Sequence, residues 1–189
     1  MVASVRLLAT MVLGAAVLSG CSGTVMQSRI DRPGADQFFR YGAAPGEMKA
    51  VVVGNPFPVP KQEVDQAVVD AMQRNHNGPM THFSTNPGPE AHKDYRIVMA
   101  FNTPTAFQPE NLCKAPDTIP SGKDVKDLKL LAGFCVGDTL YSRAKVSATS
   151  ISSPSDPRFK GMVQTAMREL VPVKDPFDQD DSCKWRQCS

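Results

Sequence analysis

The spacing of hydrophobic residues along the chain predicts two amphipathic helices. In residues 60–75, which begin with Pro60, apolar side chains recur at i, i+3, i+4, i+7 and i+8, the spacing of one side of a helix. Residues 157–170 also have helical spacing of apolar side chains. Asp156 suits the N-cap of this helix, and Pro157 suits its first position. Each helix therefore has one apolar side, formed by Val64, Ala67, Val68, Ala71 and Met72 in the first and by Phe159, Met162, Val163, Ala166 and Leu170 in the second.

Shorter patterns predict strands. Residues 49–54 form a β-branched run without alternation, which is typical of a strand buried on both faces. Residues 94–102 alternate, so that one face of this strand is fully apolar. A further short strand is expected within residues 80–85.

A hairpin is predicted at residues 128–136 and 139–150, because Gly137 and Asp138 between them suit a two-residue turn with glycine first. The small residues of its second strand would let a helix pack closely. We expect one face of that strand to carry Leu140, Ser142, Ala144, Val146 and Ala148, and the opposite face Tyr141, Arg143 and Lys145.

The resulting order, β-α-β-β-β-β-α, predicts an α+β fold. We expect a two-layer sandwich in which both amphipathic helices cover one face of a four- to five-stranded, mostly antiparallel sheet. This single domain is expected to occupy residues 49–172. Residues 21–48, which contain glycine and proline turn signals, are interpreted as a tether, and residues 173–189 as a polar tail. Within the tether, Phe38, Phe39 and Tyr41 are expected to belong to an arm that packs back over the domain, with a partner contact as the alternative.

The N-terminal segment has the organisation of an export signal. Arg6 precedes an apolar run that is shorter than the ~20 residues of a membrane-spanning helix. The run ends in two small residues and a cysteine, and this motif resembles the lipobox of bacterial lipoproteins: Leu18-Ser19-Gly20-Cys21. The resemblance implies removal of residues 1–20, diacylglycerol on the Cys21 sulfur and a further acyl chain on its new amino terminus. An ordinary secretory signal that leaves Cys21 as a free thiol is the alternative.

The residue after Cys21 bears on the destination of the protein. It is Ser22, and in the lipoprotein family the absence of aspartate at this position implies release to the outer membrane. We therefore expect a protein that is held on the outer membrane by lipid and faces the periplasm. Two or more acyl chains anchor a protein stably, because each buried methylene contributes ~0.8 kcal/mol.

The remaining cysteines are even in number, which favours disulfides in an exported chain. Their spacing suggests the pairs Cys113–Cys135 and Cys183–Cys188, although four cysteines permit three pairings. The first bridge would pin residues 103–127, a proline-containing stretch without a hydrophobic period. Zinc is the alternative, but Cys113 and Cys135 lack the close spacing of a structural zinc site.

The near-neutral charge balance limits the classes of partner that we expect this chain to bind. The chain has 21 Lys and Arg against 19 Asp and Glu, and removal of residues 1–20 takes away only Arg6. No run of basic residues occurs, so nucleic acid is not expected as a partner. The expected partners are the membrane, through lipid on Cys21, and a protein of the cell envelope.

Catalytic motifs are absent from the sequence. It contains no G-x-S-x-G elbow, G-x-G-x-x-G loop or P-loop, so we expect no enzymatic activity, no catalytic residue and no cofactor. The alternative is a periplasmic enzyme or metal-binding protein that uses His76, His82 and His92 together with Asp94. No two of these histidines lie at i, i+4 on one helix, so solvated loop histidines are favoured over a metal site.

The expected contact surface is the sheet face that the helices leave free, with residues 103–127 beside it, because loops on rigid scaffolds often hold binding residues. It would include Arg96, Tyr141, Arg143 and Lys145. The predicted layout is similar to that of the lipoproteins that assist lipopolysaccharide assembly. Three segments are also similar to a family of alphaproteobacterial lipoproteins, which implies no particular activity: Asn55-Pro56-Phe57, Asn111-Leu112-Cys113 and Ala132-Gly133-Phe134-Cys135.

Overall fold

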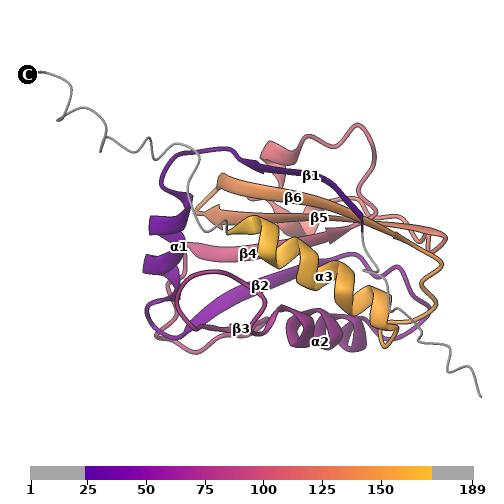
Figure 1. Cartoon of the computed structure of the whole chain (residues 1–189), viewed down its shortest axis with the longest axis horizontal. Helices are drawn as coiled ribbons and strands as arrows, with labels where there is room; N and C mark the ends of the chain where they lie inside the picture. Colours follow the sequence, from indigo (N-terminus) through magenta and orange to yellow (C-terminus); the bar gives the residue numbers. More distant parts are fainter. Residues whose placement is uncertain (1–23, 172–189) are drawn as a thin grey trace, which may run out of the picture.

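A six-stranded sheet with helices on one side forms the body of the protein (Figure 1). The computed structural model describes residues 24–171, so the predicted signal segment, Cys21 and the tail with Cys183 and Cys188 lie outside the described residues. The elements in chain order are β1 (Thr24–Ile30), α1 (Ala35–Ala43), β2 (Glu47–Val53), α2 (Lys61–Met72), β3 (His82–Ser84), β4 (Tyr95–Phe101), the 3-10 turns η1 (Pro109–Asn111) and η2 (Pro116–Thr118), β5 (Asp127–Val136), β6 (Thr139–Thr149) and α3 (Pro157–Leu170).

The sheet is mixed, with the strand order β1-β6-β5-β4-β2-β3. β2 runs parallel to β3 and β4, whereas the β4–β5, β5–β6 and β1–β6 pairs are antiparallel. The chain passes from β2 to its parallel neighbours through α2, the kind of crossover that parallel pairing requires. The α+β class is confirmed. The expected four or five strands and two helices fall short of the six strands and three α-helices in the described residues.

α2 and α3 lie together on one face of the sheet (Figure 1). Their apolar sides and the facing strand residues form one hydrophobic core, in which Val68 of α2 and Met162 of α3 are fully buried. Ser142 of β6 donates a hydrogen bond of 2.6 Å from Oγ to the Leu170 carbonyl, which satisfies an acceptor at the end of α3. None of the helices in the described part of the chain is long and apolar enough to cross a bilayer.

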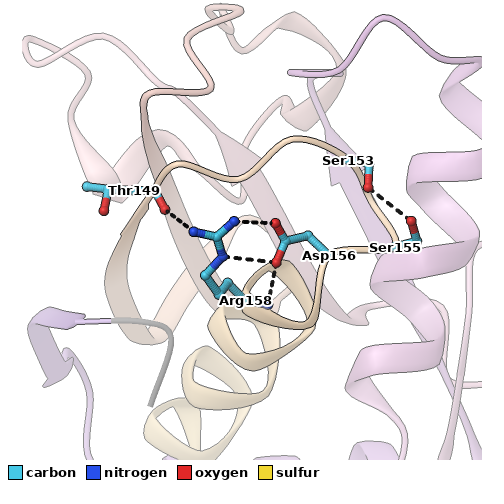
Figure 2. Close-up of polar contacts among 5 residues, drawn as sticks. All are labelled: Thr149, Ser153, Ser155, Asp156 and Arg158. Atoms are coloured by element: carbon cyan, nitrogen blue, oxygen red, sulfur yellow. Dashed lines mark hydrogen bonds and ion pairs between the residues drawn. The ribbon is translucent and has the colours of Figure 1, made fainter. Parts of the chain in front are cut away.

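α3 begins at the predicted cap. Asp156 Oδ1 accepts a hydrogen bond of 2.9 Å from the Arg158 backbone N–H, and Asp156 Oδ2 accepts one of 2.7 Å from the Arg158 guanidinium (Figure 2). The side-chain hydrogen bonds from Arg158 lower the pKa of the Asp156 carboxyl from 3.8 to about 2. The cap therefore remains ionised, and able to accept both hydrogen bonds, throughout the neutral and mildly acidic range.

The β5–β6 hairpin forms as predicted, with Gly137 of its turn at φ 55°. Its register, however, shifts between Phe134 and Cys135, which makes Tyr141 the extra residue of a β-bulge. Beyond a bulge the two faces of a strand exchange. Leu140 therefore packs on the side away from the helices, and Tyr141 packs on the helix side, which is the reverse of the prediction for these two residues.

Residues 24–43 belong to the domain, in contrast to the predicted tether. β1 pairs with β6 as an edge strand, and α1 lies across one end of the sheet (Figure 1). Phe39 of α1 is fully buried, and its ring centroid lies 5.5 Å from that of Phe134. The burial of Phe39 agrees with the expected arm, but the expected absence of regular elements from this stretch was wrong, because burial of the apolar side of α1 outweighs the local glycine and proline signals around it.

The second face of the sheet is covered by the segment between β4 and β5, which carries η1 and η2. Cys113 in this segment forms a disulfide with Cys135 of β5, as predicted. Leu112 beside it is fully buried in a second, smaller core. A side chain at Gly133 would prevent this packing, because its Cβ would lie 2.4 Å from Leu112 Cδ2. The segment between β4 and β5 thus forms a second layer, which the disulfide holds on the sheet.

Candidate functional site

A polar cleft of about 400 Å³ lies beside β2 where β3 ends. β3 pairs only with residues 47–49 of β2, whereas β4 pairs with residues 49–53. Within residues 24–171, residues 50–53 therefore have no strand partner on the side opposite β4. An edge of this kind presents backbone N–H and C=O groups with which another extended chain can pair.

Lys61 covers one position of this edge. Its Nζ donates a hydrogen bond of 2.9 Å to the Val52 carbonyl and also contacts the Asp65 carboxylate. Lysine near an open edge is a common protection against uncontrolled strand pairing. The remaining part opens into the cleft, because Ala50 and Val51 contribute to its lining.

Basic side chains line the cleft on the side away from α2. Lys49 and Lys93 are exposed, whereas Arg96 is half-buried and donates from Nη2 to the Cys113 carbonyl. Two carboxylates also line the cleft, those of Asp65 and Asp117, and the first is already engaged by Lys61. Lys49 and Lys93 have no ion pair within residues 24–171. Their ammonium groups and the strand edge together suit an extended ligand that carries carboxylates.

Neither Lys49 nor Lys93 was predicted as a binding residue. Lys49 could be recognised only as a polar residue at the start of an apolar run, and Lys93 precedes a strand without any motif. The parallel pairing of β2 with β4 brings both lysines to one cleft. No local sequence pattern predicts this pairing. Of the four side chains predicted for the contact surface, Arg96 lines this cleft, together with Pro116 and Asp117 of the segment predicted beside it.

The sheet face that was predicted to be a free contact surface is not free, since the segment between β4 and β5 covers it. Arg143, which was expected to be exposed, is buried. Its Nη1 lies 3.0 Å from the Glu110 carboxylate of η1, and its Nη2 lies 3.5 Å from the Asp31 carboxylate that follows β1. Lys145 is half-buried at the edge of a small hollow with Phe107. The Arg143–Glu110 ion pair joins β6 to the covering segment.

The carboxyl groups around Arg143 differ in environment. Burial raises the pKa of Asp31, against the opposing influence of Arg143 and Arg29. A hydrogen bond from its own backbone and a second from the Arg143 side chain lower the pKa of Glu110. The ionised form of Glu110 is thus favoured where the loop meets β6, which keeps the charge-assisted hydrogen bond intact near neutral pH.

The three histidines have separate surroundings. His76 lies 3.0 Å from the Pro79 carbonyl through Nε2, His82 is exposed on β3, and the His92 ring stacks on Tyr41 with centroids 4.4 Å apart. In the described residues, no group of three His, Cys, Asp or Glu side chains could hold a metal ion, and Asp94 completes no such group. The arrangement therefore adds no support to the metal-binding alternative.

Comparison with known proteins gives little further information. No protein-family model matches the sequence, and no curated protein matches it. Solved structures similar to the chain include a PelC dodecamer from Paraburkholderia phytofirmans, at 11% identity and a TM-score of 0.42. A single-residue variant of it in another crystal form also matches, at 11% identity and a TM-score of 0.41. Each match covers 80% of this chain and 99% of the other.

Proposed function

We propose that this protein is a lipoprotein of the bacterial cell envelope, anchored by lipid on Cys21, which acts as a non-enzymatic binding module at the periplasmic face of the outer membrane. The observation that carries the proposal is the position of the lipobox-like motif relative to the fold. Cys21 lies three residues before Thr24, the first residue of β1. At ~3.3–3.6 Å per residue, this linker spans at most about 11 Å. The anchor would therefore hold the domain directly on the membrane surface.

Loss of the acceptor sulfur is expected to release the protein from membranes. In the test variant, Cys21→Ser is combined with replacement of residues 1–20 by an ordinary cleavable secretion signal, so that no apolar signal remains attached. We expect the wild type in the membrane fraction and the variant in the soluble periplasmic fraction. The fractions are washed with concentrated salt, which removes association by charge alone.

A matched control is Ser22→Ala with the native signal, which keeps the cysteine and should remain membrane-bound. Retention of the Cys21→Ser chain in the salt-washed membrane fraction would count against the lipid anchor.

The binding role is assigned to the cleft beside β2. The proposed partner is an envelope protein that adds an extended, carboxylate-bearing segment to the free edge at residues 50–53. The proposal is supported by the absence of a strand partner for these residues in the described part of the chain and by the exposed Lys49 and Lys93 next to them. Backbone pairing gives such a complex its affinity, and charges beside the edge contribute to its specificity.

Charge reversal in the cleft is expected to remove the partner. We expect Lys49→Glu combined with Lys93→Glu to lose an envelope protein that co-purifies with the wild type after cross-linking in cells, because like charges would then face the carboxylates. Lys114→Glu combined with Arg74→Glu makes the same change in net charge at exposed positions outside the cleft and should retain it. An unchanged set of co-purifying proteins in the cleft variant would refute this assignment.

A further inference from the structure

The short distance between Cys21 and β1 specifies which end of the domain faces the membrane. β1 begins where β6 ends, since Thr24 pairs with Ser147. β5 begins at the same end, because Asp127 pairs with Thr149. α3 also begins there, since Arg158 Nη1 lies 3.5 Å from the Thr149 carbonyl (Figure 2). α1 lies at the opposite end of the sheet (Figure 1).

Basic residues outnumber acidic ones at the end where β1 begins. The segments that meet there include residues 54–63, 122–129, 145–150 and 156–160, and they contain seven Lys or Arg against three Asp and one Glu. The chain as a whole has a formal net charge of only +2. The excess of three positive charges at this end is thus larger than the net charge of the protein, so the charge is unevenly distributed.

The ion pairs at this end leave most of the lysines available. Asp127 pairs with Lys129 at 3.1 Å, and Asp156 pairs with Arg158 at 2.7 Å (Figure 2). Asp124 Oδ1 accepts a hydrogen bond of 2.8 Å from a backbone N–H. The basic end is defined here by three exposed lysines that have no ion pair within residues 24–171: Lys123, Lys126 and Lys160.

Lys160 lies in the first turn of α3, where its positive charge is unfavourable for the helix. The first turn of α3 has no acidic residue after its cap and contains Arg158 and Lys160. Positive charge near a helix N-terminus is unfavourable, because the helix dipole is positive there. The Asp156 carboxylate offsets the charge of Arg158, but Lys160 has no comparable partner among the described residues. A residue such as Lys160, whose charge is locally unfavourable for its helix, is typical of a binding site.

We propose that the basic end binds the anionic phospholipid headgroups of the membrane to which Cys21 is anchored. This inference rests on the proposed lipid anchor for its orientation, because the anchor brings Lys123, Lys126 and Lys160 to the lipid surface. The residues between the anchor and β1, Ser22 and Gly23, are uncharged and too few to hold the domain away. Lipid holds the protein on the membrane, and the lysines fix the orientation of the domain, with α1 directed away from the surface.

The expected size of the effect follows from the contribution of each charge. A Lys near an anionic membrane surface contributes ~1 kcal/mol, which corresponds to about fivefold in affinity. Three lysines together should therefore account for on the order of a hundredfold. Because the Debye length is ~8–10 Å at physiological salt, binding through these lysines should weaken steeply as salt is added.

The test uses the mature chain from residue 21 onward with Cys21→Ser, so that no lipid contributes. Sedimentation with vesicles of phosphatidylglycerol and phosphatidylethanolamine is compared with sedimentation with phosphatidylcholine vesicles. We expect binding to the anionic vesicles only, a loss on the order of a hundredfold for Lys123→Gln/Lys126→Gln/Lys160→Gln, and release by salt. The control, Arg32→Gln/Arg74→Gln/Arg168→Gln, removes three exposed charges at the opposite end and should bind as the unsubstituted chain does.

Equal binding by the two triple variants would overturn the proposal, as would binding that is insensitive to salt or no binding to anionic vesicles at all. Circular dichroism of each variant ensures that folded proteins are compared. Failure here is distinguishable from failure of the lipid anchor, because the anchor is tested by fractionation of the lipidated wild type and the basic end by a chain without lipid.

Discussion

Replacing Phe39 by alanine is expected to lower the free energy of unfolding by about 3–5 kcal/mol, the usual cost of deleting a buried aromatic ring. Phe39 is fully buried in the main core, where its ring contacts those of Phe134 and His76 with centroids 5.5 Å away in both cases. A tether could not show such an effect, since its side chains would be solvated. Urea unfolding followed by circular dichroism measures the difference.

The neighbouring phenylalanine supplies a matched control. Phe38 is 37% exposed and contacts Tyr141 with ring centroids 4.7 Å apart. Truncation of this half-solvated ring leaves no closed cavity, so Phe38→Ala is expected to cost about 1 kcal/mol or less. Equally small effects of the two substitutions would mean that α1 is not part of the folded core and that the tether prediction was correct.

Removing the disulfide with Cys113→Ala and Cys135→Ala is expected to lower the free energy of unfolding by about 3 kcal/mol in the chain-entropy model. The bridge closes a loop with a sequence separation of 22 residues. It holds the segment that covers one face of the sheet, so its loss would also expose Arg143 and the second core. Urea unfolding with and without reductant measures the effect.

The tail cysteines provide the control for this experiment. A chain with Cys183→Ala and Cys188→Ala retains the Cys113–Cys135 bridge, so reductant should destabilise it as much as it destabilises the wild type. Reductant should have no such effect on the Cys113→Ala/Cys135→Ala chain. Undiminished stability of that chain would show that the covering segment is held by side-chain packing alone.

The elements that could be predicted from the sequence are those whose signals are local. α2 and α3 follow from helical spacing, and the start of α3 follows from the Asp156 cap and Pro157. The hairpin follows from the glycine of its turn, because few residues adopt a positive φ as readily. The Cys113–Cys135 bridge was predicted from the cysteine spacing and from the expectation that the chain is exported.

The parts that could not be predicted depend on contacts between distant segments. Ala35, Phe39 and Ala43 do have helical spacing, but the segment is short, and its stability comes from packing on Phe134. β1 becomes a strand by pairing with β6, and the open edge of β2 results from a β3 of only three residues. No local sequence pattern predicts the β-bulge at Tyr141 either. The cleft therefore follows from topology and not from a motif.

Whether Cys21 carries the membrane anchor is shown by the intact mass of the native protein extracted from membranes, measured with and without reduction and thiol alkylation. We expect the mass of residues 21–189 plus acyl groups, lowered by the four hydrogen atoms lost when two disulfides form. An unlipidated mass, with Cys21 open to alkylation, would contradict this expectation.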